Sequence, residues 1–134
     1  EKGLEIIRDF WGEMLERGAT TWWETFDRST PHCTVPYHFT LNNPTYLNDY
    51  VPVSYCHGWG AGPAYVLMKY VLGVRPVDND FQEFIFDPYT AGIDCCCGIV
   101  PTKYGDIKVK WEKEDNGDLV YEVEKPEQCR IIKD

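Results

Sequence analysis

The chain has 134 residues, enough for one ordinary domain or two small pieces. Its apolar share of 43% and charged share of 26% are typical of a soluble globular protein, and no apolar run approaches the ~20 residues of a membrane-spanning helix. The net charge of −9 argues against nucleic acid and against an anionic membrane as partners, because both demand a basic surface. We therefore expect a soluble protein, cytoplasmic or else periplasmic or secreted, and the sequence does not choose among these compartments.

Residues 4–17 are predicted to form an amphipathic helix, and Gly18 follows as its natural end. Five apolar residues fall on one face at helical spacing: Ile7, Phe10, Trp11, Met14 and Leu15. Residues 19–26 are rich in threonine and aromatic residues, which favours a loop or a short extended stretch. Residues 27–55 hold several prolines and little periodicity, which is typical of turns.

A second helix is expected from about Trp59 to Leu72, ending at Gly73. Proline is best tolerated in the first turn of a helix, so Pro63 moves the expected start toward Gly62. The small residues around this start allow another backbone or a ligand to come close.

Alternating apolar residues predict strands around residues 84–86, 107–111 and 119–123. Asn116-Gly117 predicts a two-residue hairpin turn, with lysines and glutamates facing each other across the hairpin. The half from Pro76 onward is expected to form one or two small antiparallel sheets. The fold class is therefore α+β, and its apolar helix faces need partners, either a missing upstream helical domain, which we prefer, or a second copy in a homo-oligomer.

The six cysteines suggest no metal centre. Cys95, Cys96 and Cys97 are consecutive, and three consecutive residues of a strand cannot all point one way. The usual paired zinc spacings are absent, and the three histidines show no ligand spacing either. We interpret the cysteine run as small apolar strand residues and expect neither a metal nor a cofactor.

Glu24 is the candidate catalytic carboxylate. It lies between bulky aromatic residues and beside the hydroxyl-bearing Thr20, Thr21 and Thr25. Such surroundings desolvate a carboxylate, which is typical of enzymatic general acids and bases, although a surface glutamate or one paired with arginine has the same local sequence. His57, just before the second helix, is a candidate for bonding a sugar hydroxyl, with a structural histidine as the alternative.

Four segments, in order, resemble glycoside hydrolase family 78, the bacterial α-L-rhamnosidases. Residues 18–26 (GATTWWETF) resemble the family's GATT-aromatic-WE motif, and residues 56–65 (CHGWGAGPAY) resemble a segment that usually contains His-Gly-Trp-Ser-Ala-Gly-Pro. Residues 70–76 (YVLGVRP) resemble the following helix exit. Residues 98–111 (GIVPTKYGDIKVKW) resemble the family's C-terminal β domain. Two departures are Gly60 in place of the usual serine and a long loop from Pro31 to Pro52 that could reshape the pocket rim.

This resemblance implies an (α/α)6 barrel followed by a β-sandwich domain, with residues 1–75 as the barrel's last helices and residues 76–134 as the β domain. It implies an inverting hydrolase of α-L-rhamnosides in which Glu24 is the general base. His57 would lie near the bound sugar, and Trp22 or Trp23 would line the pocket. The family's general acid lies upstream of any segment present here, so the chain alone is expected to be inactive.

Two other functions remain compatible with the sequence. One is another (α/α)6-barrel glycosidase, which the upstream pocket residues would distinguish. The other is a non-catalytic carbohydrate-binding or structural module built from the β half, which rhamnose binding by the isolated chain would favour.

Overall fold

The computed structural model describes residues 2–29, 34–36, 50–52, 54–90 and 92–132. The chain divides into two compact units, Glu1–Pro63 and Ala64–Asp134. The boundary falls within the second helix, and Glu24 and His57 both lie in the first unit. No helix in the described ranges is both long and apolar enough to cross a membrane.

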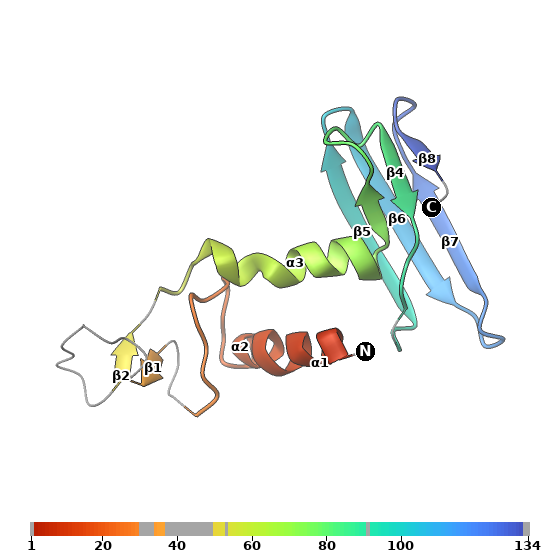
Figure 1. The fold of residues 1–134 in the computed structure, drawn as a ribbon. Helices are drawn as coiled ribbons and strands as arrows, with labels where there is room; N and C mark the ends of the chain where they lie inside the picture. Colours follow the sequence, from red (N-terminus) through yellow and green to blue (C-terminus); the bar gives the residue numbers. More distant parts are fainter. Residues whose placement is uncertain (1, 30–33, 37–49, 53, 91, 133–134) are drawn as a thin grey trace. The chain divides into compact units, whose positions relative to one another are not determined.

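The first unit begins with a continuous helical segment (Figure 1), made of α1 (Lys2–Ile7), the π-helical turn η1 (Arg8–Gly12) and α2 (Glu13–Glu16). The predicted helix over residues 4–17 is thus confirmed. Gly18 ends it with φ +86°, a left-handed conformation that glycine adopts without a steric penalty. The amide of Ala19 then donates to the Met14 carbonyl at 2.9 Å, which satisfies one of the last carbonyls of the helix.

The helix buries a narrower apolar face than its periodicity predicts. Met14 packs with Trp23 in a small core, against which Trp11, Ala19 and Phe26 lie partly buried. Phe10 and Leu15, both expected on the buried face, are 40% and 56% exposed. This exposure agrees with the expectation that the apolar face of the helix needs a further partner. Association through these exposed side chains stays a prediction.

Glu13 links α2 to Arg28, just after the motif of residues 18–26. Its carboxylate pairs with Arg17 at 2.5 Å and with Arg28 at 2.6 Å. The hydrogen bond from Arg17, aided by the charge of Arg28, holds the pKa of the Glu13 carboxyl below its ordinary value. The Arg17 guanidinium also lies over the Phe26 ring, 4.8 Å from its centroid. These contacts tie residues 26–28 back to the helix.

Two short strands of the first unit, β1 (Thr34–Pro36) and β2 (Tyr50–Pro52), pair antiparallel with Val35 opposite Val51. The remainder of the long loop predicted from Pro31 to Pro52 lies outside the described residues. His32, Cys33 and His38 are in that part.

The second helical segment consists of the 3-10 turn η3 (Gly58–Ala61), α3 (Gly62–Val66) and the π-helical turn η4 (Leu67–Val71). This confirms the predicted helix, including an α-helical start at Gly62. Gly73 ends the helix with φ +84°, and a Cβ there would lie 2.4 Å from the Pro88 nitrogen. No other residue type fits that position without displacing the backbone.

Two three-stranded sheets make up most of the second unit (Figure 1). One has the order β3-β4-β8, from Val74–Pro76, Glu83–Phe86 and Arg130–Ile132. The other has the order β5-β6-β7, from Cys95–Thr102, Gly105–Lys113 and Leu119–Glu124. The expectation of purely antiparallel sheets is wrong in one place, because β4 and β8 run parallel, with Phe84 opposite Ile131.

The core of this unit comes from alternate residues of its strands. In β6, Ile107, Val109 and Trp111 are buried while the residues between them are exposed, as the alternation predicts. The other buried side chains are those of Val71, Leu72, Val74, Phe84, Val100 and Cys129. On the outer face of the same sheet Lys108 pairs with Glu124 at 3.0 Å, which confirms the cross-strand pairing of opposite charges.

The β6–β7 hairpin closes differently from the prediction. The Glu114 amide bonds the Asp118 carbonyl at 2.8 Å, and the Gly117 amide bonds the Glu114 carbonyl at 2.8 Å, so the loop has three residues. A two-residue type I′ turn needs positive φ at both central positions. Gly117 has φ +91°, but Asn116 is not among the positive-φ residues. The left-handed glycine therefore follows a β-turn, the usual arrangement of a three-residue hairpin.

The cysteines of β5 alternate, as expected for a strand: Cys95 and Cys97 are exposed and Cys96 is partly buried. Burial, with a smaller contribution from the neighbouring thiols, raises the pKa of Cys96. All described cysteines, Cys56 and Cys129 included, are free thiols.

The different burial of the cysteines in β5 predicts an order of thiol reactivity. Because the thiolate is the reactive form, Cys96 should be alkylated more slowly near neutral pH than Cys95 and Cys97, with the buried Cys129 slowest. Timed iodoacetamide labelling followed by peptide mass spectrometry measures each rate. Equal rates at Cys96 and Cys97 would contradict the alternation of the strand.

Candidate functional site

The two motif segments of the first unit lie against each other through their backbones. The Glu24 amide donates to the Ser54 carbonyl at 2.9 Å, and the His57 amide donates to the Trp22 carbonyl at 2.9 Å. The Thr21 hydroxyl donates to the Tyr55 carbonyl between them. Residues 21–24 thus form a loop without helix or strand, one of the two predicted alternatives, and this loop is hydrogen-bonded to residues 54–57. Segments some 30 residues apart are thereby brought to one place.

Glu24 is held at its carboxylate as well as at its backbone. Its Oε2 accepts the Ser54 amide at 3.0 Å, and it is partly buried. The other oxygen, Oε1, has no hydrogen-bond partner among the described residues. A carboxylate with one oxygen fixed and the other open has the arrangement needed to accept a proton from a bound water.

His57 and Trp59 flank this glutamate. The indole nitrogen of Trp59 donates to the Glu24 carbonyl. The His57 ring lies against the Trp59 ring, with 4.5 Å between centroids and 44° between planes. His57 is half-buried, and its backbone is extended just before η3 begins. The predicted candidates Glu24 and His57 are therefore linked through one tryptophan side chain.

The two tryptophans of the motif have different environments. Trp23 is 3% exposed and lies in the core, 5.5 Å from the Tyr55 ring and 6.0 Å from the Phe26 ring between centroids. Trp22 is half-buried and lines a cavity of about 180 Å³ whose other walls are Leu15, Thr20 and Thr21. Of the two, Trp22 has the side chain that faces open space.

Sequence reasoning missed Ser54 and Trp59 as parts of this site. Ser54 acts through its backbone, which its residue type does not reveal. Trp59 belongs to the segment that resembles the family, but its position at the expected helix start suggested no partner. Its contact with Glu24 spans 35 residues, and no local pattern encodes such a contact.

Gly60 explains how closely the two segments approach. It is buried, and a Cβ at this position would lie 2.6 Å from the Trp23 carbonyl oxygen and 3.0 Å from the Trp22 Cβ. Its carbonyl accepts the Trp11 indole N–H at 2.7 Å. The departure from the usual serine therefore coincides with a backbone contact that leaves no room for a side chain.

We expect Gly60→Ser to lower the stability of the first unit by about 1–3 kcal/mol, the usual cost of forcing extra atoms into a packed site. Gly58→Ser is the matched control, because Gly58 lies in the same turn and a Cβ there meets nothing within 4 Å. Thermal melting of the two variants compares them directly. Equal melting temperatures would show that the backbone of residues 22–23 moves aside freely.

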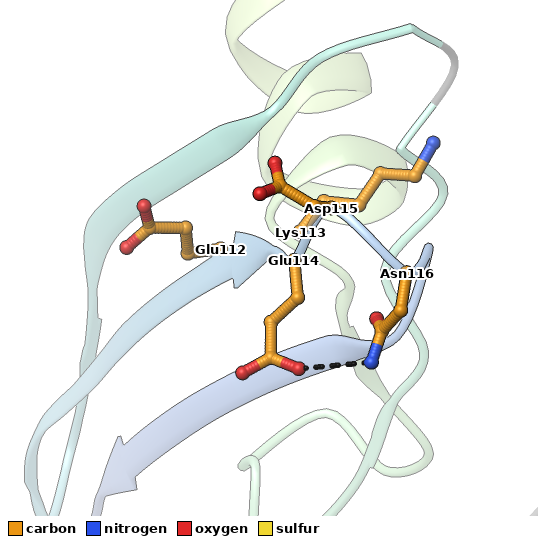
Figure 2. Close-up of a pocket in the computed structure, with 5 residues that line it drawn as sticks. All are labelled: Glu112, Lys113, Glu114, Asp115 and Asn116. Atoms are coloured by element: carbon orange, nitrogen blue, oxygen red, sulfur yellow. Dashed lines mark hydrogen bonds between the residues drawn. The ribbon is translucent and has the colours of Figure 1, made fainter.

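A second cavity lies at the acidic hairpin between β6 and β7. A cavity of about 470 Å³ there is lined by Glu112, Lys113, Glu114, Asp115 and Asn116. Figure 2 shows the carboxylates pointing in different directions, with Asn116 bonded to Glu114 at 3.3 Å. Within the described ranges no three His, Cys, Asp or Glu side chains form a group that could hold a metal ion. These acids are exposed to solvent at the end of the hairpin.

Comparison with known proteins relates the chain to the bacterial α-L-rhamnosidases. Residues 73–132 match the family model described as the bacterial α-L-rhamnosidase C-terminal domain. Among solved structures, the chain is similar to the family 78 rhamnosidase of Bacillus sp. GL1, with 28% identity and a TM-score of 0.73 over 98% of this chain. A search of curated proteins finds no match.

A second solved structure supports the fold. The Streptomyces avermitilis α-L-rhamnosidase, solved with L-rhamnose, matches 90% of the chain with a TM-score of 0.65 and 17% identity. The chain spans 13% of the Bacillus protein and 11% of the Streptomyces protein. The chain is thus similar to the C-terminal part of bacterial α-L-rhamnosidases of glycoside hydrolase family 78, and its residues 73–132 match the model of their C-terminal domain.

Proposed function

We propose that this chain supplies the general base of an inverting α-L-rhamnosidase, and that the base is Glu24. The observation that carries the proposal is the meeting of residues 21–24 with residues 54–57. There Glu24 keeps one carboxylate oxygen on the Ser54 amide and leaves the other open. Both segments resemble family motifs, and the similarity to the Bacillus rhamnosidase covers both.

The chemistry follows from that geometry. Inverting glycosidases need two carboxyl groups roughly 6.5–9.5 Å apart, so that a water fits between one of them and the anomeric carbon. Glu24 takes a proton from this water through its open oxygen while the water attacks. The general acid that protonates the departing glycosidic oxygen belongs to a segment upstream of this chain, which on this proposal is inactive by itself.

His57 and Trp22 are the residues that we propose for contact with the sugar. His57 packs against Trp59 beside Glu24, and within the described ranges its imidazole nitrogens have no hydrogen bond, so they are available for a rhamnose hydroxyl. Trp22 lines a cavity, whereas Trp23 is enclosed in the core. Trp22 is therefore the better candidate for contact with the sugar. The substrate is a rhamnose-containing glycan or glycoside.

The domain division belongs to the same proposal. Residues 1–75 are the last helices of an (α/α)6 barrel, and residues 76–134 form the C-terminal β-sandwich domain. The family match that begins at residue 73 supports the second part, and the two three-stranded sheets of Ala64–Asp134 are compatible with it.

The configuration of the first product tests this function. The full-length protein that carries this chain is incubated with an aryl α-L-rhamnoside, and the anomeric proton of the released sugar is followed by NMR before mutarotation. An inverting enzyme releases β-L-rhamnose first. Early release of α-L-rhamnose, or no hydrolysis of rhamnosides, would overturn the proposal.

A further inference from the structure

Trp59 combines two properties that rarely occur together. Its side chain is 71% exposed, the most exposed of the large apolar side chains in the described ranges, yet its indole N–H is used internally by the Glu24 carbonyl. The His57 ring packs on the indole at 4.5 Å. An exposed indole has water available for its N–H, so burial does not explain why it bonds this particular carbonyl.

Glu24 needs such support because no helix or strand fixes its backbone. Three groups hold it: the Ser54 carbonyl accepts its amide at 2.9 Å, the Ser54 amide binds its carboxylate at 3.0 Å, and Trp59 binds its carbonyl. The first two come from the backbone of one residue. Trp59 is the side chain among the three, and it holds the peptide that follows Glu24.

The turn that presents Trp59 is itself well anchored. The Gly60 amide donates to the His57 carbonyl at 3.0 Å, and Trp11 binds the Gly60 carbonyl at 2.7 Å. Gly60 packs directly on the backbone of Trp22 and Trp23. The indole therefore extends from a fixed base, which makes it able to hold a less constrained loop.

We propose that Trp59 is a positioning residue that fixes the orientation of Glu24 through the indole N–H bond to the Glu24 carbonyl. The inference rests on the proposed role of Glu24 as general base. The bond sets the direction of the peptide after Glu24 and, with Ser54, the direction in which the open Oε1 points. Without it the carboxylate still binds Ser54 but samples orientations that do not meet the attacking water.

The test removes the N–H and little else. In the full-length protein, Trp59 is replaced by β-(3-benzothienyl)alanine, which has nearly the same shape without the donor, and separately by phenylalanine. Because the loss is one of alignment, kcat should fall about 10- to 100-fold. The KM for the rhamnoside should stay within about twofold, since the ring that packs on His57 is retained.

Trp111→Phe is the matched control. It also removes an indole N–H from a backbone carbonyl, but that carbonyl belongs to Val71, outside the candidate site. We expect its melting temperature to fall at least as much as that of Trp59→Phe, with kcat nearly unchanged. If both benzothienylalanine and phenylalanine at position 59 keep full kcat, or if Trp111→Phe loses as much kcat as they do, Trp59 has no positioning role.

Glu24→Gln, measured in the same experiment, separates the general-base role of Glu24 from the positioning role of Trp59. An inactive Glu24→Gln with fully active Trp59 variants overturns the positioning role alone. A fully active Glu24→Gln overturns the role of Glu24 as general base, whatever the Trp59 variants do. The benzothienylalanine protein keeps the test decisive if Trp59→Phe fails to fold.

Discussion

Glu24→Gln in the full-length protein is expected to lower kcat by about 10²- to 10⁴-fold, the usual contribution of a general acid or base. Glutamine keeps the shape of the side chain and an oxygen that accepts the Ser54 amide, a bond of 3.0 Å in the native chain. It cannot take a proton from water. The loss should therefore appear in turnover of an aryl α-L-rhamnoside, while the affinity for L-rhamnose, measured by calorimetry, stays nearly the same.

Glu16→Gln is the control for this experiment. Glu16 is an exposed residue at the end of α2 in the same unit, and removing its charge changes the net charge of the protein by the same amount. Full activity of Glu16→Gln beside an inactive Glu24→Gln assigns the loss to the site. Normal turnover by Glu24→Gln would exclude Glu24 as the base.

Local patterns in the sequence predict most of the elements, because the signals for them are local. Gly18 and Gly73 end their helices with φ of +86° and +84°, at the positions where the apolar periodicity stops. The strand alternation from Ile107 to Trp111 correctly separates buried from exposed residues. These features depend on neighbours within a few residues, so a single sequence contains the necessary information.

The errors arise where pairing or backbone twist decides the structure. Asn116-Gly117 is the standard signal for a two-residue turn, but the Glu114–Asp118 bond closes the hairpin one residue wider. The parallel pairing of β4 with β8 joins residues 47 positions apart, such as Phe84 and Ile131, and no periodicity predicts it.

In the candidate site, too, the local motifs could be predicted from the sequence and the long-range contacts could not. Glu24 and His57 were recognisable because each lies in a motif that resembles a known family. What holds them together was not recognisable. The Trp59 indole and the Ser54 backbone act across 30 to 35 residues, and their roles depend on a packing of two loops that Gly60 makes possible.

Trp111→Ala is expected to destabilise the second unit by about 3–5 kcal/mol, a large share of the ~5–15 kcal/mol that stabilises an ordinary domain. Trp111 is fully buried in β6, the central strand of its sheet, opposite Cys96 on one side and Tyr121 on the other. Its indole N–H donates to the Val71 carbonyl at 2.9 Å. Alanine would remove the largest core side chain and leave that carbonyl buried without its partner.

Two further variants separate the effect of lost side-chain volume from the effect of the lost hydrogen bond. Trp111→Phe keeps most of the ring volume but loses the N–H, so its cost should be nearer the ~1–3 kcal/mol of an unsatisfied buried polar group. Val120→Ala, at a 54% exposed position of β7, should stay within about 0.5 kcal/mol. Hydrogen exchange of the β6 amides measures the opening free energy of this unit for each variant. Exchange as slow in Trp111→Ala as in Val120→Ala would contradict this prediction, because it would mean that the other buried residues, such as Phe84 and Ile107, suffice to hold the unit.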